Sequence, residues 1–147
     1  MATLIEATAA AQVALVRELF AEYARLIDEP CCFADFDREL AALPGPYRLF
    51  LLEDAAGCVG VRLLDPHTAE MKRLYVRAAH RGRGLGRALA EAAIAAAREA
   101  GCARIVLDTL PKMREALALY RMLEFRPIAP YLENPTPGAI CFELILS

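Results

Sequence analysis

Apolar positions recur at the period of a helix in some stretches of the chain and run together in others. Near the start, Val13, Val16, Phe20, Tyr23 and Ile27 are three to four residues apart, which predicts an amphipathic helix. A later stretch is rich in Ala and Leu, the best helix formers, and ends at a glycine. A weaker pattern predicts a helix at residues 35–43, and Pro111 can open another. The predicted helices are therefore residues 13–27, 35–43, 85–100 and 111–123.

Between these helices lie short apolar runs with β-branched and aromatic residues, which favour strands. Asp54 to Gly57 separates two of them as a hairpin turn, and Pro66 ends the second. The run from Arg104 to Asp108 follows a strand and a helix, so we expect it to pair in parallel with that strand. Strands are predicted at residues 3–7, 47–53, 58–64, 70–76, 104–108, 125–128 and 140–146, which gives the order β-α-α-β-β-β-α-β-α-β-β.

Size and composition restrict the class of protein. With 147 residues, no repeat and no linker, the chain is expected to form a single domain, residues 1–147, with its own core. The formal net charge of -2 predicts no nucleic-acid surface, and the most apolar stretch contains charges and is too short to span a membrane. The five cysteines lack disulfide-like or zinc-like spacing, and the start shows no signal peptide. We therefore expect a cytoplasmic protein with reduced thiols and no metal.

A glycine-rich stretch joins the strand that ends at Val76 to the helix that follows. It reads Arg81-Gly82-Arg83-Gly84-Leu85-Gly86. Glycine lets backbone N–H groups approach a ligand, and the first amides of a helix have no partner within it. The positive end of the helix dipole lies there too, so the junction suits an anion, most often a phosphate. A dinucleotide-binding G-x-G-x-x-G is not met, because its third glycine would fall on Arg87 or Leu89, and a P-loop ending is absent.

The loop instead fits the pattern Gln/Arg-x-x-Gly-x-Gly/Ala through Arg81, Gly84 and Gly86. Leu74-Tyr75-Val76 precedes it, and the block Ala-Leu-Tyr-Arg-Met-Leu-Glu-Phe follows at residues 118–125. With these motifs and the element order, nearly the whole chain resembles the GNAT superfamily of acetyl-CoA-dependent N-acetyltransferases. The resemblance implies an α/β (α+β) fold with a mixed, mostly antiparallel sheet of about six to seven strands and four helices. It also implies transfer of acetyl from acetyl-CoA, as cosubstrate, to a primary amine by direct attack.

The resemblance also implies where coenzyme A binds. In this family, backbone amides of the strand before the loop face the pantetheine arm and the thioester, and a bulge there would leave such donors unpaired. The loop holds the pyrophosphate, and its arginines contact the pyrophosphate or the ribose phosphate. The alternatives are a plain core strand and a solvated basic turn. The implied cofactor-binding residues are Leu74, Tyr75, Val76, Arg81, Gly82, Arg83, Gly84, Leu85, Gly86 and Arg87.

Two side chains are implied for the chemistry. Tyr120 matches the family tyrosine that protonates the leaving thiolate, although it also lies on an apolar helix face and could be a core residue. Glu70 lies where several family members place the base that takes a proton from the amine. The alternative for Glu70 is a surface glutamate that pairs with Lys72, and Asp108 is a weaker candidate for the base.

Two positions depart from the family pattern. Met113 stands where many members carry an asparagine that hydrogen-bonds the pantetheine arm, so that contact is missing or comes from Thr109. Glu124 stands where glycine is favoured before Phe125, and we expect it to accept the turn geometry, with a positive φ, at modest cost.

In this family the acceptor pocket is covered by the first two helices and by the loop before the last strand, here about residues 27–36 and 129–138. Carboxylates there would attract a cationic amine, on which Tyr131 could stack. We therefore expect a small cationic amine as acceptor and a monomer or homodimer. The alternatives are an acetyltransferase acting on protein amines and a non-catalytic acyl-CoA-binding regulatory module. The carboxylates are Asp28, Glu29, Asp35 and Glu133.

Overall fold

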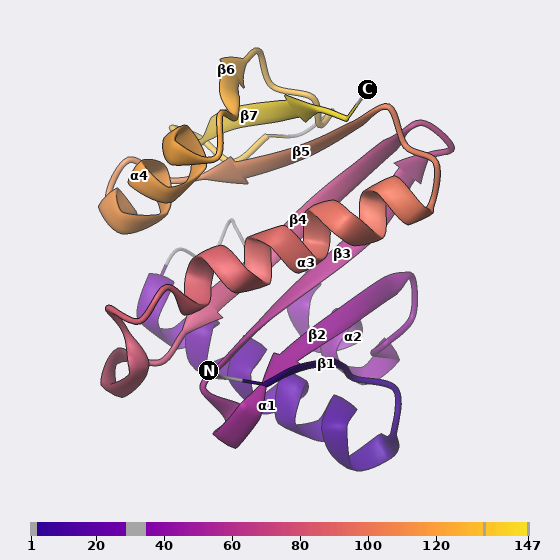
Figure 1. Ribbon diagram of the computed structural model, residues 1–147, viewed down its shortest axis with the longest axis vertical. Coiled ribbons are helices and arrows are strands. Elements are labelled where there is room, and N and C mark those ends of the chain that lie inside the picture. Colours follow the sequence, from indigo (N-terminus) through magenta and orange to yellow (C-terminus); the bar gives the residue numbers. More distant parts are fainter. Residues whose placement is uncertain (1–2, 29–34, 134, 147) are drawn as a thin grey trace.

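The computed structural model describes residues 3–28, 35–133 and 135–146 of the chain. Within them, seven strands form one sheet in the order β1-β2-β3-β4-β5-β7-β6, and four α-helices accompany it (Figure 1). The strands are β1 (Leu4–Glu6), β2 (Tyr47–Leu52), β3 (Gly57–Asp65), β4 (Thr68–Val76), β5 (Arg104–Thr109), β6 (Arg126–Ile128) and β7 (Ile140–Ile145). The helices are α1 (Ala10–Ile27), α2 (Phe36–Ala42), α3 (Leu85–Glu99) and α4 (Arg114–Met122).

The element order and the sheet type agree with the expectations from the sequence. Neighbouring strands are antiparallel except β4 and β5, which pair in parallel across the α3 crossover. Most boundaries lie within two residues of those predicted, and the largest differences are at α1, which begins at Ala10, and at α4, which begins at Arg114. Helix α4 starts late because the preceding Met113, with ψ 63°, is not helical. The mixed, mostly antiparallel α/β fold is therefore confirmed.

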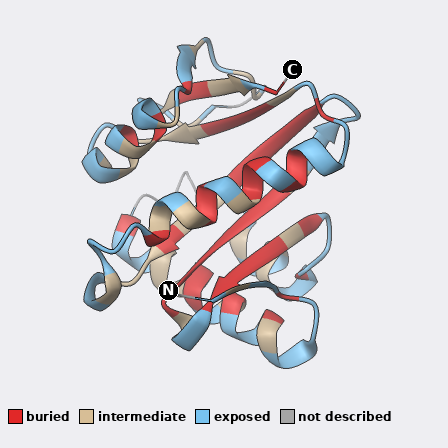
Figure 2. Ribbon diagram, viewed as in Figure 1, coloured by how far each residue is buried: buried red, intermediate tan, exposed pale blue. Residues whose placement is uncertain are grey.

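The sheet separates two apolar clusters. One lies between the sheet and helices α3 and α4, and it includes Leu89, Ile94 and Phe142. The other packs α1 against the opposite face through Val16 and Phe20. Figure 2 shows the buried residues running along the central strands and along the inner side of α3. Because both faces of the central strands are covered, even a polar side chain on β4 can be withdrawn from solvent.

Strands β4 and β5 run together only at their beginnings. Thr68–Glu70 pairs with Arg104–Val106, and the rest of β4, which the structure describes in full, does not pair with β5. The two ribbons diverge from that point (Figure 1), while β5 stays paired with β7 along its length. The far half of β4 therefore has β3 as its strand partner on one side and faces away from β5 on the other.

Strand β4 also carries a bulge in its far half. Cys58 of β3 faces Tyr75, while Gly60 faces Lys72, so one β3 residue lies opposite two residues of β4. Arg73, within this bulge, has a φ of 60°. A bulge frees backbone groups from the regular ladder, which is the feature expected for a strand that binds a ligand through its backbone.

No helix among the described residues is long and apolar enough to cross a bilayer.

Candidate active site

The glycine loop leads from the end of β4 into the first turn of α3. Gly84 is the N-cap of α3 and adopts a left-handed conformation, with φ 73° and ψ 15°. Gly82 is also left-handed, with φ 82°. A Cβ placed on either glycine would meet nothing within 4 Å, so the loop is open on that side. The first N–H groups of the 15-residue helix α3 therefore end at an accessible loop, as an anion site requires.

The third glycine has a different role, because Gly86 lies against α4 and β4. A Cβ on Gly86 would meet Leu119 at 3.5 Å, Leu74 at 3.9 Å and Val76 at 4.0 Å. These are ordinary contact distances, so an alanine would fit. This agrees with the Gly/Ala alternative at that place in the family pattern. Leu85 beside it is buried, so a contact from this residue to the cofactor would come from its backbone.

The loop arginines differ in their surroundings. Arg81 donates from Nε to the backbone oxygen of Val76 at 3.0 Å, which ties the loop to the end of β4. Nε of Arg87 lies 3.6 Å from Oε1 of Glu91, and the two side chains form an exposed ion pair on the first turns of α3. Arg83 is exposed, and the first turn of α3 contains no acidic residue. The loop is therefore basic and open, although Arg81 also serves to hold the loop in place.

The strand segment before the loop contributes side chains to the core. Tyr75 is buried, with its ring centroid 5.5 Å from that of Tyr23 on α1. Leu74 and Val76 are half-buried and pack against the α3 cluster. The prediction that these residues act through their backbone is compatible with this placement, since their side chains are engaged in packing.

Tyr120 of α4 is both a core residue and a candidate acid. Its ring lies 5.8 Å from that of Phe125 and 6.2 Å from that of Phe142, and the residue is buried. Burial raises the pKa of Tyr120 above its ordinary value, and the nearby Tyr23 and Asp108 raise it further. A phenol is already protonated at neutral pH at its ordinary pKa of about 10, so the hydroxyl is a proton donor, and the raised pKa makes it a weaker acid.

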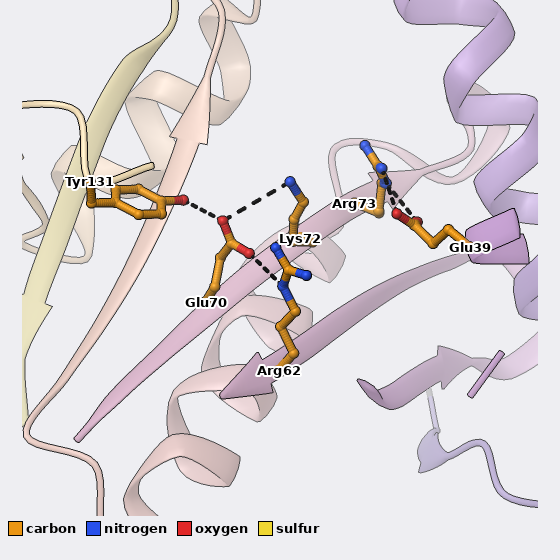
Figure 3. Close-up of polar contacts among 6 residues, drawn as sticks. All are labelled: Glu39, Arg62, Glu70, Lys72, Arg73 and Tyr131. Atoms are coloured by element: carbon orange, nitrogen blue, oxygen red, sulfur yellow. Dashed lines mark hydrogen bonds and ion pairs between the residues drawn. The ribbon is translucent and has the colours of Figure 1, made fainter. Parts of the chain in front are cut away.

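Glu70 occupies the point where β4 and β5 separate, and its side chain is 0% exposed (Figure 3). Its Oε1 accepts a 2.8 Å hydrogen bond from Nε of Arg62, and its Oε2 accepts a 2.6 Å bond from the hydroxyl of Tyr131. Nζ of Lys72 lies 4.0 Å from Oε2. The alternative of a surface glutamate is therefore wrong, because β4 is a central strand covered on this face. The expected ion pair with Lys72 is present, but it is the longest of the three contacts of Glu70.

Tyr131 and Arg62 were not expected beside Glu70. The sequence suggested that Tyr131 stacks on the amine, whereas the structure directs its hydroxyl to the Glu70 carboxylate. Burial raises the pKa of Tyr131, and Glu70 raises it further. Arg62 faces Glu70 directly across the β3–β4 hairpin, so hairpin register was the signal that could have found this pair. The position of Tyr131 depends on how the β6–β7 loop folds back, which no local pattern indicates.

The acidic segments expected around the acceptor are placed at the surface. Asp28, Asp35 and Glu133 are exposed, while Glu29 lies outside the described residues. A cation lies near the first of them, because Nζ of Lys112 donates a 2.7 Å hydrogen bond to the backbone oxygen of Ile27, the residue before Asp28. The charge of Lys112 therefore offsets part of the negative charge of Asp28.

The two departures from the family pattern have different outcomes. Glu124 has a φ of 70°, so the expected positive φ before Phe125 is confirmed. Met113 is the N-cap of α4 and makes no side-chain capping hydrogen bond. Thr109 and Asp108 end β5 half-buried, near the divergence from β4. Within the part of the chain that the structure describes, no group of three or more His, Cys, Asp or Glu residues could hold a metal ion.

Residues 13–125 match the sequence profile of the acetyltransferase (GNAT) family. The chain belongs to this family. An uncharacterized N-acetyltransferase of Schizosaccharomyces pombe is 39% identical over 94 residues, which are 63% of this chain and 58% of that protein. The chain thus covers less than two thirds of that relative. An uncharacterized N-acetyltransferase of Escherichia coli is 32% identical over 124 residues, which are 78% of this chain and 74% of the relative.

Solved GNAT structures share the architecture. An acetyltransferase of Streptococcus agalactiae has a TM-score of 0.81 at 19% identity, with 99% of this chain and 98% of that chain covered. A GNAT family acetyltransferase of Elizabethkingia anophelis, solved with acetyl-CoA bound, has a TM-score of 0.66 at 19% identity, with 99% and 98% covered. At these identities the likeness concerns the fold. The family match and the N-acetyltransferase relatives confirm the expected acetyl-CoA-dependent N-acetyltransferase. They do not identify the acceptor.

Proposed function

We propose that this chain transfers the acetyl group of acetyl-CoA to the primary amine of a small cationic molecule. One combination of features supports this most. An open, amide-bearing helix start lies beside a strand that leaves its parallel partner, and a buried carboxylate occupies the point of divergence. An acyl transfer needs a held donor, an oriented acceptor and a route for protons, and these features supply candidates for each.

In this proposal the loop and β4 hold the donor through their backbones. Gly82, Gly84 and the first amides of α3 receive the pyrophosphate, with Arg83 and Arg87 as exposed cations nearby. Leu74, Tyr75 and Val76 bind the pantetheine arm through the half of β4 that has left β5. Acetyl-CoA supplies the thioester, and the chain supplies orientation and donors aimed at the carbonyl oxygen.

Two side chains handle protons in this proposal. Glu70 takes a proton from the acceptor amine, because an ammonium cannot attack a thioester. Tyr120 gives a proton to the departing thiolate, a role supported by its place on α4, where the family motif has its tyrosine. The two groups come from different elements, which are β4 and the helix α4 that follows β5.

The acceptor assignment depends on charge. Asp28, Asp35 and Glu133 are exposed on the segments expected to cover the acceptor, and they would raise the local concentration of a small cation. We further propose a cytoplasmic monomer or homodimer. The described cysteines, which are Cys58, Cys102 and Cys141, are free thiols, in keeping with a reducing compartment.

A screen of acceptors tests the proposal. The protein is incubated with acetyl-CoA and polyamines, amino acids, aminoglycosides or histone-like peptides, and thiol release is followed against a blank without amine. Turnover on a small cationic amine supports the proposal. Turnover on peptides alone would contradict the small-molecule acceptor and leave the acetyltransferase. CoA binding without turnover on any amine would favour a regulatory binding module.

A further inference from the structure

The bulge of β4 is anchored to helix α2 through one side chain. Arg73 donates from Nη2 to Oε1 of Glu39 at 3.0 Å and from Nε to Oε2 at 3.3 Å (Figure 3). Its guanidinium also lies 5.3 Å from the ring centroid of Phe36, at the start of α2. The Arg73 side chain is only 7% exposed, and that of Glu39 is 21% exposed. The ion pair is therefore largely shielded from solvent and salt.

The backbone at the same residue is in an unfavourable region. Arg73 has a φ of 60°, and a side chain with a Cβ rarely adopts this conformation unless its surroundings hold it there. A two-bond contact between a guanidinium and a carboxylate fixes orientation as well as distance. Glu39 and Phe36 thus hold the side chain of the one β4 residue whose backbone departs most from an extended strand.

We infer that Arg73 and Glu39 are positioning residues for acetyl-CoA. Their contact holds the bulge in the conformation that makes the backbone of Leu74 and Tyr75 available to the pantetheine arm. This inference rests on the proposed assignment of that segment to the arm. It links α2, which lies on the side expected to cover the acceptor, to the strand that holds the donor.

Two ligands separate this role from general stabilisation. CoA carries the pantetheine arm, whereas 3′-phosphoadenosine 5′-diphosphate keeps the phosphates and lacks the arm. Glu39→Gln keeps the size of the side chain but removes its charge and one acceptor. It should lower the affinity for CoA about tenfold and change the affinity for the armless ligand by less than about twofold. Titration calorimetry measures both affinities. Arg73→Gly, which tolerates φ 60° but loses the anchor, should weaken CoA in the same way.

A matched control is available at the far side of the sheet. Glu6 receives the same two-bond contact from Arg48, at 2.8 Å and 3.1 Å, away from the glycine loop. Glu6→Gln should leave both affinities unchanged. The double variant of Glu39 and Arg73 should bind CoA no more weakly than the weaker single variant, because both changes remove one contact.

Several results would overturn the inference. CoA affinity that is unchanged in both Glu39→Gln and Arg73→Gly excludes a positioning role. An equal loss of affinity for both ligands would indicate a general defect of the fold. Thermal unfolding of each variant would reveal such a defect independently. If the parent protein binds CoA no more tightly than the armless ligand, the assignment of β4 to the arm is wrong, and the inference falls with it.

Discussion

The Tyr120 ring packs in the core, so its hydroxyl can be tested by itself. Tyr120→Phe keeps the ring contacts with Phe125 and Phe142 and removes only the proton donor. We expect the turnover number to fall about a hundredfold, as is typical for the loss of a general acid, while the affinity for acetyl-CoA changes little. Steady-state kinetics with an acceptor from the screen, together with calorimetric titration of CoA, would measure both.

The raised pKa of Tyr120 gives this prediction a direction in pH. The phenol loses its proton only above its ordinary value of about 10, so the acid stays competent across the neutral range. The deficit of Tyr120→Phe should therefore be nearly constant between about pH 6 and pH 9. An unaffected turnover number would assign Tyr120 to the core alone.

Glu70 and Tyr131 form a pair whose members can be separated experimentally. Glu70→Gln should depress the rate mainly near neutral pH, where the acceptor is an ammonium and must lose a proton. At higher pH the amine is deprotonated in solution, so the deficit should shrink. Tyr131→Phe removes the 2.6 Å hydrogen bond to Glu70 and should cause a smaller loss, about tenfold, with the same pH dependence. Rate profiles against pH for the three proteins measure this.

The parent protein supplies the internal reference for these profiles, because its rate should rise with pH and then level off. A Glu70→Gln deficit that persists at high pH would show that the carboxylate acts by structure rather than as a base. Such a structural effect has a physical basis, because Gln at position 70 removes the negative charge that balances the Arg62 guanidinium 2.8 Å away. Thermal unfolding of the variant would expose such a structural effect.

The start and the end of α3 offer a matched pair of glycines. Gly84 precedes the helix with φ 73°, Gly101 follows it with φ 80°, and a Cβ on either would meet nothing within 4 Å. Valine at either site should cost about 1–2 kcal/mol of stability, because a β-branched residue disfavours this backbone region. Gly84→Val alone should abolish CoA binding up to about millimolar concentrations, since its side chain would stand where the phosphate must approach.

Calorimetric titration of CoA into both variants decides this prediction. Gly101→Val should bind as the parent does, because it lies at the opposite end of the helix from the loop. If Gly84→Val bound CoA as tightly as the parent, the loop would not be the phosphate anchor. If both variants lost binding, the defect would lie in the stability of α3 rather than in the loop.

Helices and strands were predictable from the sequence because their signals are local. The spacing of apolar residues from Val13 to Ile27 and the alanine-rich run after the glycine loop correspond directly to α1 and α3. The loop at the start of α3 was predictable as well, because glycines at a strand–helix junction have few other uses. Local chemistry thus sufficed for the order of the elements and for the position of the glycine loop.

The surroundings of Glu70 were not predictable in the same way. Alternation along the strand suggested Lys72 as its partner, and Lys72 does lie 4.0 Å from the carboxylate. The two shorter contacts of the carboxylate were missed. Arg62 and Tyr131 reach the carboxylate through hairpin register and through the return of the β6–β7 loop. The contact between Arg73 and Glu39 joins residues from different elements and depends on where α2 docks. Such tertiary contacts have no periodic signature in one sequence.

The continuous sheet connects all parts of the molecule. It carries the α1 cluster on one face and the α3 cluster on the other, and no described strand lies outside it. The donor loop lies at one end of α3, while Glu70 is buried beneath the β6–β7 loop, so both halves of the proposed site depend on the same sheet. Loss of either cluster would therefore disturb binding and chemistry together.

This architecture predicts that the chain unfolds as the single domain expected from its length. Calorimetric and van't Hoff enthalpies should agree, with one transition. CoA at about 100 times its dissociation constant should add about 2.7 kcal/mol of stability and raise the melting temperature by about 5–10 °C. Gly84→Val should unfold in one transition too, but without this shift, because it no longer binds the ligand. Two separate transitions, or a ligand shift confined to part of the transition, would show that the two sides of the sheet melt independently.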